Sequence, residues 1–155
     1  MIEVRPASSA DIDEIKRVSA SGLKTLRCVY RPNHAALQRR QALGENAVTL
    51  VALIQNQIVG VVRYREESPR LHVFGLAVDE RFRRRSVARV LLEEIASRAV
   101  AGSFQCVSLF TIRQTGNVSI FERLGFEVVR EQDDDTSISE SGAVLTEVYM
   151  ERALL

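Results

Sequence analysis

The fold is decided by a stretch in the middle of the chain, Leu76-Ala77-Val78-Asp79-Glu80-Arg81-Phe82-Arg83-Arg84-Arg85-Ser86-Val87-Ala88-Arg89. Its start completes an apolar run, Leu71 to Val78, that is typical of a strand buried on both faces. Its end enters Ser86 to Val100, where apolar residues recur at helical spacing, and a further apolar run, Phe104 to Ile112, follows. This order of strand, helix and strand predicts a right-handed crossover between two parallel strands.

The loop inside this stretch has the composition of an anion-binding site. The first backbone N–H groups of a helix have no partner within the helix, and the helix dipole adds partial positive charge there. Arg83 to Arg85 and Arg89 place cationic donors around that point, and the small residues Ser86 and Ala88 leave room for an anion. The pattern predicts a diphosphate site, although a solvated basic turn or a nucleic-acid patch would have the same composition.

The rest of the chain predicts the other helices and strands of a single domain over residues 1–155. Its expected fold class is α/β, with mixed α+β character. Apolar or alternating runs predict further strands at residues 2–6, 48–54, 58–64, 126–129 and 144–150. Helices are predicted from Ser8 or Ser9 through the stripe of Ile12, Ile15 and Val18, over Asn33 to Leu43, and over residues 115–124. A tight turn is expected at residues 55–57 and a surface loop at Asp133-Asp134-Asp135. Strands this apolar need helices on both faces.

Composition excludes several classes of protein. The chain has 155 residues, of which 46% are hydrophobic and 26% charged, so collagen-like, low-complexity and disulfide-rich chains are excluded. No apolar run reaches the roughly 20 residues of a membrane span, and the first residues lack the pattern of a signal peptide. Cys28 and Cys106 are expected to be reduced and buried. We therefore expect a cytoplasmic protein with no membrane contact and no metal site.

The charges are unevenly distributed along the chain. Residues 1–100 carry 17 basic and 11 acidic side chains, whereas residues 101–155 carry 4 and 9. A nucleic-acid binder fits poorly, because the C-terminal third is acidic, aromatic residues make up only 6% and no helix-turn-helix or RNA-binding motif is present. A dinucleotide-binding oxidoreductase would need a Gly-x-Gly-x-x-Gly turn, which the sequence lacks.

Two motifs resemble those of the GNAT superfamily of acyl-CoA-dependent N-acyltransferases. The segment Arg83-Arg84-Arg85-Ser86-Val87-Ala88 matches the frame of the family's pyrophosphate loop, which is Gln or Arg, two residues, Gly, one residue, and Gly or Ala. The segment Asn117-Val118-Ser119-Ile120-Phe121-Glu122-Arg123-Leu124-Gly125-Phe126 is similar to the family's short helix beside the cofactor. The resemblance covers residues 2–150 and implies a GNAT-like fold, a central twisted mixed sheet of about six or seven strands with a splayed parallel pair.

The resemblance also implies an activity and its partners. Members of the family move an acetyl group from acetyl-CoA to an amine of a small molecule, peptide or protein, by direct attack in a ternary complex and without a metal. The partners expected are thus acyl-CoA and an amine acceptor, with no nucleic acid and no membrane, and homodimers are common in the family. The implied cofactor-binding residues are Leu76, Ala77, Val78, Arg83, Arg84, Arg85, Ser86, Val87, Ala88, Arg89, Asn117 and Phe121.

In the family, the pantetheine arm lies in the gap between the two splayed strands. Gly75 is consistent with a bulge that opens the strand pairing there. The thioester carbonyl would then lie beside the main chain of Leu76 to Val78, whose N–H groups could stabilise an oxyanion.

Three positions depart from the family pattern. Ser86 replaces a glycine of the pyrophosphate loop, and we expect it to accept a helical geometry easily. Phe121 replaces the tyrosine that protonates the departing thiolate in many members. Gln114 replaces the usual asparagine, although Asn117 lies close enough in sequence to serve instead. A non-catalytic acyl-CoA-binding or regulatory module is therefore the alternative to an enzyme.

The candidate general base is His72. It lies two alternations before Leu76, so we expect the two side chains to share a strand face. A histidine of ordinary pKa could accept the proton of the acceptor amine; a packed or exposed structural histidine is the other interpretation. Arg27, Tyr30 and Arg31 lie in the segment that covers the acceptor in the family, where they could select a substrate carboxylate.

Overall fold

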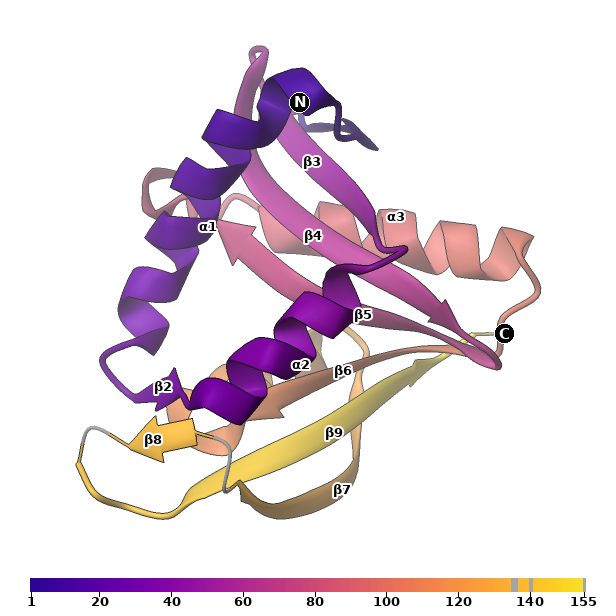
Figure 1. The fold of residues 1–155 in the computed structure, drawn as a ribbon. Coiled ribbons are helices and arrows are strands. Elements are labelled where there is room, and N and C mark those ends of the chain that lie inside the picture. The colour runs from indigo at the N-terminus through magenta and orange to yellow at the C-terminus, as the bar shows by residue number, and fades with distance from the viewer. Residues whose placement is uncertain (135–136, 140, 155) are drawn as a thin grey trace.

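A computed structural model describes residues 1–134, 137–139 and 141–154. Its helices are α1 (Ile12–Leu26), α2 (His34–Gly44), α3 (Val87–Ala101) and α4 (Asn117–Arg123). Its strands are β1 (Glu3–Pro6), β2 (Tyr30–Pro32), β3 (Val48–Ile54), β4 (Gln57–Glu67), β5 (Arg70–Val78), β6 (Cys106–Ile112), β7 (Glu127–Asp134), β8 (Ser137–Ser139) and β9 (Leu145–Ala153) (Figure 1). Of the expected acidic loop, Asp133 and Asp134 belong to β7 instead, and Asp135 lies outside the described residues.

Seven strands form one twisted sheet in the order β1-β3-β4-β5-β6-β9-β7. The pair β5–β6 is parallel, whereas the other adjacent pairs of this sheet are antiparallel. The α3 crossover joins the two parallel strands, as the sequence predicts. The last strand, β9, lies inside the sheet, and β7 forms its edge with its first seven residues exposed. The predicted mixed α/β fold class is confirmed.

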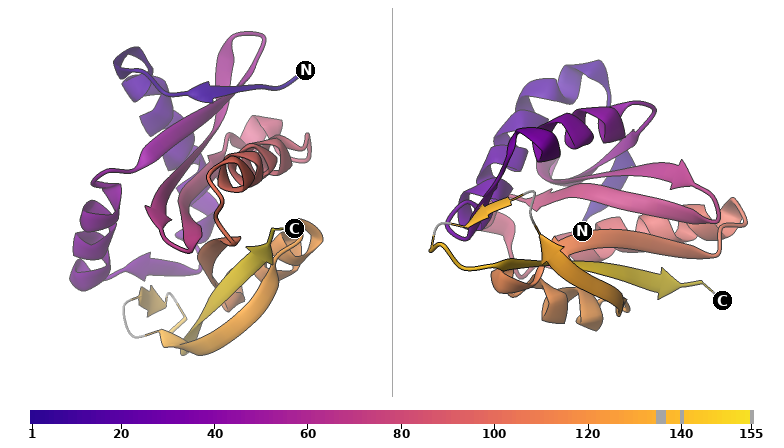
Figure 2. Two further views of the ribbon diagram at one scale, coloured as in Figure 1. Left: turned by 90° about the vertical axis from the view of Figure 1, so that its right-hand side faces the viewer. Right: turned by 60° about the horizontal axis from the view of Figure 1, so that its bottom comes forward.

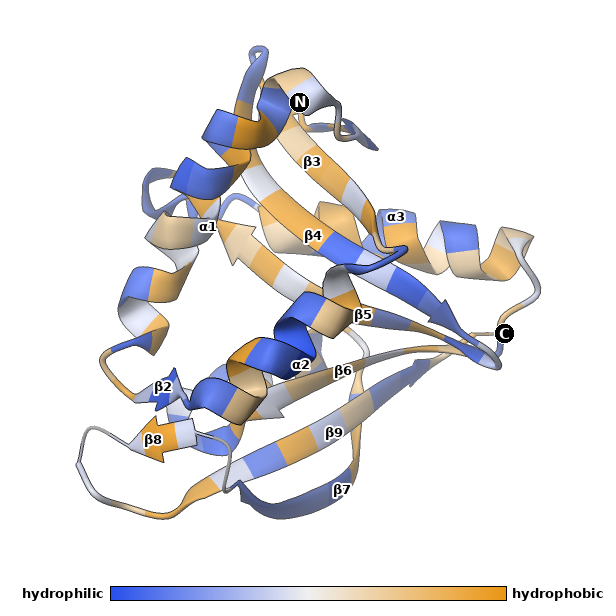
Figure 3. Ribbon diagram, viewed as in Figure 1, coloured by the Kyte–Doolittle hydropathy of each residue, from blue (hydrophilic) through white to orange (hydrophobic). Residues whose placement is uncertain are grey.

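Helices cover both faces of this sheet. On one face, α1 packs Ile15 and Val18 against Val51 and Ile58. On the other face, α3 packs its apolar side, including Leu91, against the larger core. Figure 2 shows α1 and α2 on the opposite side of the sheet from α3. Figure 3 shows the reason: β3 and the first half of β4 are almost continuously hydrophobic, whereas β7 is polar.

Several predictions from local pattern were wrong. α1 continues to Leu26 through a polar stretch, because its second half packs closely on β5 through Gly22. Ile12 is exposed, not part of the buried stripe, and Cys28 is exposed as well. Residues 30–32 and 137–139 pair as a small separate sheet, β2–β8. The sequence does not predict this sheet, because strands of three residues are too short to show an alternating pattern.

No helix in the described part of the chain is long and apolar enough to cross a membrane.

Candidate functional site

The parallel strands β5 and β6 separate soon after they meet. They pair only at Arg70 with Cys106, Leu71 with Val107, and His72 with Ser108 within the described residues. Beyond this point β5 contains a bulge: its register against β4 shifts, and Gly75 has a φ of +65°, a conformation that glycine adopts without steric cost. The expected splay and bulge are confirmed, and the edge of β5 toward β6 is left without a strand partner.

The bulge reverses which side chains face each helix layer. Before it, Leu71 and Val73 pack into the core that α3 covers; after it, Leu76 and Val78 contact that same core. His72 lies between the first pair, so its side chain faces the α1 and α2 side of the sheet. The expectation that His72 shares a face with Leu76 is therefore wrong, because the extra residue of the bulge inverts the alternation.

α3 begins directly beside the end of β5. Its first intrahelical bond joins Val90 N–H to the Ser86 carbonyl at 3.0 Å, which leaves the N–H groups of residues 87–89 without helical partners. Among the described residues, the Ser86 hydroxyl makes no cap to these groups. Arg83, Arg84, Arg85 and Arg89 are exposed around this helix end, so the predicted cationic surroundings of open amides are present.

The conformation of Ser86 differs from the expected one. Its φ and ψ are 64° and 19°, in the left-handed region, and Arg84 also has a φ of 64°. The expectation of an easily accepted helical geometry is wrong, because a side chain at positive φ approaches the neighbouring carbonyl. A glycine has no such clash, which is the physical reason for a glycine in this frame.

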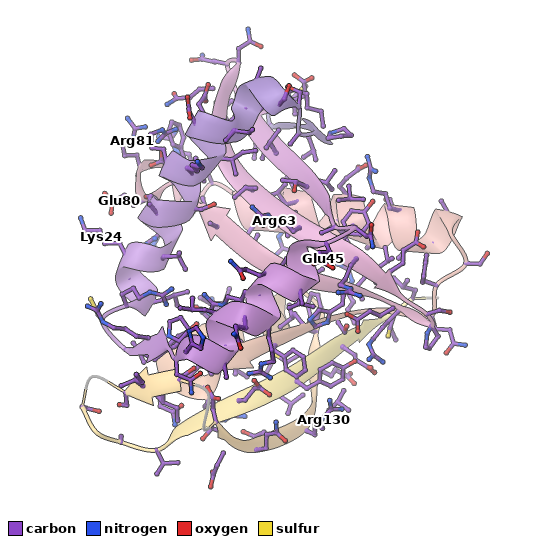
Figure 4. All side chains as sticks on the ribbon, viewed as in Figure 1. Lys24, Glu45, Arg63, Glu80, Arg81 and Arg130 are labelled. Atoms are coloured by element: carbon purple, nitrogen blue, oxygen red, sulfur yellow. The ribbon has the colours of Figure 1, made fainter. Side chains whose placement is uncertain are left out.

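A buried carboxylate holds the loop in place. Asp79, which is 2% exposed, accepts hydrogen bonds from Arg17 Nη1 at 2.6 Å and from the side chain and backbone N–H of Arg81 at 3.0 Å. Arg81, and after it Arg17, hold the pKa of Asp79 well below its usual range. Figure 4 shows Glu80 and Arg81 beside the lower part of α1, where Glu80 N–H bonds the Ser21 hydroxyl at 3.1 Å. Sequence reasoning missed this anchor, since Arg17 is 62 residues from Asp79.

His72 lies at the last paired position before the strands separate. Its side chain is 4% exposed, its Nδ1 is 2.9 Å from the Ser108 hydroxyl, and its ring packs edge-on against Phe110. Burial lowers the pKa of His72 below the ordinary value; Arg70 and Arg65 act in the same direction and Glu67 opposes them. The imidazole is therefore neutral at neutral pH.

The polar groups near that imidazole extend to β9. The Tyr149 hydroxyl donates to Glu151 Oε2 at 2.6 Å, because a carboxylate can only accept. Burial and the hydrogen bond to Glu151 raise the pKa of Tyr149, whereas its interaction with Ser108 lowers it. In the bond between His72 and Ser108, either Nδ1 or the hydroxyl can be the donor, depending on the tautomer of the imidazole.

The region around α4 holds the other expected positions. Asn117 and Phe121 are half-buried, and Phe121 packs edge-on against Phe126 with ring centroids 6.0 Å apart. Gln114 is bound to β9, where its Oε1 accepts from Thr146 N–H at 2.9 Å. This side chain thus connects two elements of the scaffold, and Asn117 is the amide that lies on α4 itself.

Comparisons with known proteins match this architecture. The sequence model described as "Acetyltransferase (GNAT) domain" matches residues 14–139. N-acetylaspartate synthetase from Danio rerio is 26% identical over 118 residues, which are 74% of this chain and 42% of the relative, so the chain spans less than half of that protein's length.

Two solved structures share the fold over almost their whole length. The protein smu.2055 from Streptococcus mutans UA159 superposes with a TM-score of 0.77 at 21% identity, covering 99% of each chain. A Bacillus subtilis acetyltransferase in complex with CoA superposes with a TM-score of 0.75 at 13% identity, covering 100% of each chain. The resemblance seen in the two sequence motifs is confirmed.

Replacement of Ser86 by glycine should stabilise the protein. Relief of the left-handed strain is worth about 1 kcal/mol, partly offset by the greater freedom of glycine in the unfolded chain. Urea unfolding of Ser86→Gly measures the change. Ser119→Gly, in the right-handed helix α4, is the matched control and should lose up to about 1 kcal/mol. An equal loss in both variants would contradict the strain at Ser86.

Nuclear magnetic resonance of the histidine nitrogens tests the state of His72. In long-range 1H–15N spectra at pH 7 we expect a neutral ring with one protonated nitrogen, and a titration midpoint below 6.5. Since the unfolded chain would bind a proton that folded His72 refuses, the free energy of unfolding should fall as pH drops below about 6.5, and less so in His72→Asn. A doubly protonated ring of His72 at pH 7 would contradict the neutral imidazole.

Proposed function

Because the chain belongs to the acetyltransferase (GNAT) domain family, we propose that it transfers an acetyl group from acetyl-CoA to an amine, by direct attack within a ternary complex. The observation that carries the proposal is the open, arginine-rich start of α3, which follows the bulged and partly unpaired strand β5. The unpaired edge of β5 ends at Val78, eight residues before Ser86 at the start of α3. The start of α3 suits a diphosphate, and the strand edge suits the pantetheine that is linked to it.

The residues around the start of α3 fit a diphosphate. The N–H groups of Val87, Ala88 and Arg89 lack helical partners and can donate to phosphate oxygens. Arg83 to Arg85 add charge-assisted donors; Arg83 is itself steadied by Thr25 of α1 at 3.2 Å, and the Arg85 guanidinium lies 5.4 Å from the ring centroid of Phe82. These contacts hold the arginines near the loop without neutralising them.

The residues of β5 and α4 would orient the acyl end. The main chain of Leu76, Ala77 and Val78 follows the bulge, and N–H groups on its unpaired edge could bond the pantetheine arm and the developing oxyanion. Asn117 and Phe121 of α4 would flank the arm on the α3 side. Bound acetyl-CoA supplies the acetyl group as a thioester, and its thiol, with a pKa near 8.5, can leave without a protonating group. Phe121 has no proton to give.

His72 would act as the general base. The acceptor ammonium must lose a proton before the nitrogen can attack, and Nε2 of His72 can accept it when Nδ1 donates to Ser108. The proton taken up is stabilised by the hydrogen bond from Nδ1 to Ser108, which leads to Tyr149 and the Glu151 carboxylate. A carbon–nitrogen bond forms, the carbon–sulfur bond breaks, and the thiolate is protonated from solvent.

A non-catalytic acyl-CoA-binding module is the second candidate, and Phe121 in place of a tyrosine favours it. Such a module would bind acetyl-CoA and release no free CoA with any amine. The neutral imidazole of His72, at the point where β5 and β6 separate, favours the enzyme, because such a group can accept the proton of an amine.

Acetyl-CoA should raise the melting temperature of the protein, because it binds the folded state alone. Arg83→Glu combined with Arg85→Glu should abolish the rise by placing two carboxylates beside the phosphates. Lys16→Glu combined with Arg39→Glu changes net charge equally at exposed positions on other elements and should retain it. Equal shifts in both double variants, or no shift in the natural protein at millimolar acetyl-CoA, would refute the proposed cofactor site.

Loss of the base should slow transfer without weakening cofactor binding. Asparagine can replace the Nδ1–H donor to Ser108 but offers no base at the position of Nε2, so His72→Asn should lower kcat by about 10²–10⁴. The measurement is release of free CoA over a panel of amines, with the melting shift by acetyl-CoA as the control for folding and binding. An unchanged kcat in His72→Asn would exclude His72 as the base.

A further inference from the structure

A hollow on the α1 face of the sheet lies apart from the gap between β5 and β6. It encloses about 480 Å³ between the start of α1, the start of β3 and the middle of β4, and pockets that bind small molecules measure about 300–1,000 Å³. In the sheet, β5 lies between β4 and the gap. We call this space the α1–β3 hollow; its walls include Ile12, Ile15, Lys16, Val48, Thr49 and Arg63.

One wall of the α1–β3 hollow is apolar although it is open to solvent. Ile12 is 50% exposed and Val48 is 37% exposed, and Ile15, one turn after Ile12, belongs to the core between α1 and the sheet. Single exposed apolar side chains are common on protein surfaces, but here two of them line one concave space. A small ligand could bury hydrocarbon against them.

The same hollow contains two cations. Lys16 of α1 is exposed and Arg63 of β4 is half-buried, and neither forms an ion pair or a side-chain hydrogen bond with another described residue. The carboxylate of Asp11, which Ser8 N–H contacts at 2.7 Å, is already bound by Arg5 at 2.7 Å. A bound anion would therefore compensate a positive charge that the described part of the hollow leaves unpaired.

Contacts with the backbone position the side chain of Arg63. Thr49 of β3 is its cross-strand partner, so the two side chains are neighbours on the α1 face. A Cβ added at Gly75 would lie 3.8 Å from Cγ and Cδ of Arg63, and one added at Gly44 would lie 4.0 Å from its Nη1. The aliphatic stem thus passes beside the bulge of β5 and the guanidinium reaches toward the end of α2, between α1 and α2 (Figure 4), so its N–H groups can donate to a ligand.

We propose that the α1–β3 hollow binds a small carboxylate with a hydrocarbon body, of the size of a medium-chain fatty acid. The carboxylate would accept hydrogen bonds from Arg63 and Lys16, and the hydrocarbon would cover Ile12 and Val48. Inorganic phosphate would leave the apolar wall uncovered, and a neutral hydrocarbon would leave the two charges uncompensated. The hollow lies apart from the proposed positions of the diphosphate and the thioester, so this site is additional to the proposed acetyl transfer.

Thermal unfolding with three probes tests this chemistry. Octanoate has both the charge and the hydrocarbon, acetate has the charge alone, and 1-octanol has the hydrocarbon alone. At about ten times its Kd, octanoate should raise the melting temperature by about 3–6 °C, whereas acetate and 1-octanol at the same concentration should not raise it. An equal rise with 1-octanol, or no rise with millimolar octanoate, would overturn the proposal.

Replacement of either cation should weaken the binding of octanoate. Arg63→Met and Lys16→Met keep the aliphatic stems and remove the donors, so each should raise the Kd measured by isothermal titration calorimetry about 10–100-fold. Arg39→Met on α2 and Lys24→Met on α1 replace exposed cations outside the hollow and should leave the Kd unchanged. Since Lys16 is exposed, its variant decides the test if Arg63→Met does not fold. The same Kd in Lys16→Met and Lys24→Met would overturn the proposal.

The apolar wall has its own variant. Ile12→Ser should raise the Kd of octanoate about 5–10-fold, because the hydrocarbon loses part of the surface that it covers. Ile120→Ser is the matched control, since Ile120 is also a helical isoleucine, 47% exposed, and lies outside the hollow. A Kd that changes equally in both variants would mean that octanoate binds elsewhere.

Octanoate and acetyl-CoA should bind at the same time. In saturating acetyl-CoA the shift caused by octanoate should persist, because β5 separates the hollow from the gap. Loss of that shift would mean that octanoate occupies the cofactor site, and would overturn the proposal of a separate site. If acetyl-CoA gives no shift while octanoate still does, the proposed acetyl transfer fails and the α1–β3 hollow stands as a binding site.

Discussion

The strands β5 and β6 pair in parallel over three residue pairs. The position of each group with a proposed role depends on where this pairing ends. His72 and Ser108 form the last pair. The bulge at Gly75 then turns the remainder of β5 away from β6 and exchanges the faces of its side chains. As a result, β5 presents main-chain groups to the gap, and the loop that follows it leads to the arginine-rich start of α3.

The arginine-rich loop depends on a charge that lies beneath it. Asp79 forms ion pairs with both Arg17 and Arg81, whereas Arg83 to Arg85 are exposed. A second set of polar groups, His72, Ser108, Tyr149 and Glu151, lies on the face of the sheet that α1 and α2 cover, and α1 also contacts the loop through Ser21 and Thr25.

The pattern of neighbouring residues predicted the helices and strands whose bounds depend mainly on their own sequence. Val48 to Ile54 is a strand with the expected bounds, and α3 begins and ends within a residue of its apolar stripe. Residues 83–89 alone predicted that cationic side chains surround the start of α3. The prediction failed wherever distant segments decide the outcome. The partners of His72, Ser108 and Phe110, come from β6, and the second half of α1 packs on Ala77 of β5 through Gly22. The positive φ of Ser86 could not be predicted, because serine is common at helix starts of ordinary geometry.

The polar character of β7 has a consequence for how one molecule can associate with another. An open sheet has two rims of unsatisfied backbone groups, and either rim could recruit a strand from another molecule. Here one rim is β1, four residues long and ending in Pro6, and the other is β7, whose exposed side chains include Glu127, Arg130 and Glu131. β1 is short and ends in proline, and charged side chains flank the exposed Val128 and Val129 of β7, so neither rim offers a long apolar template for a strand of another molecule.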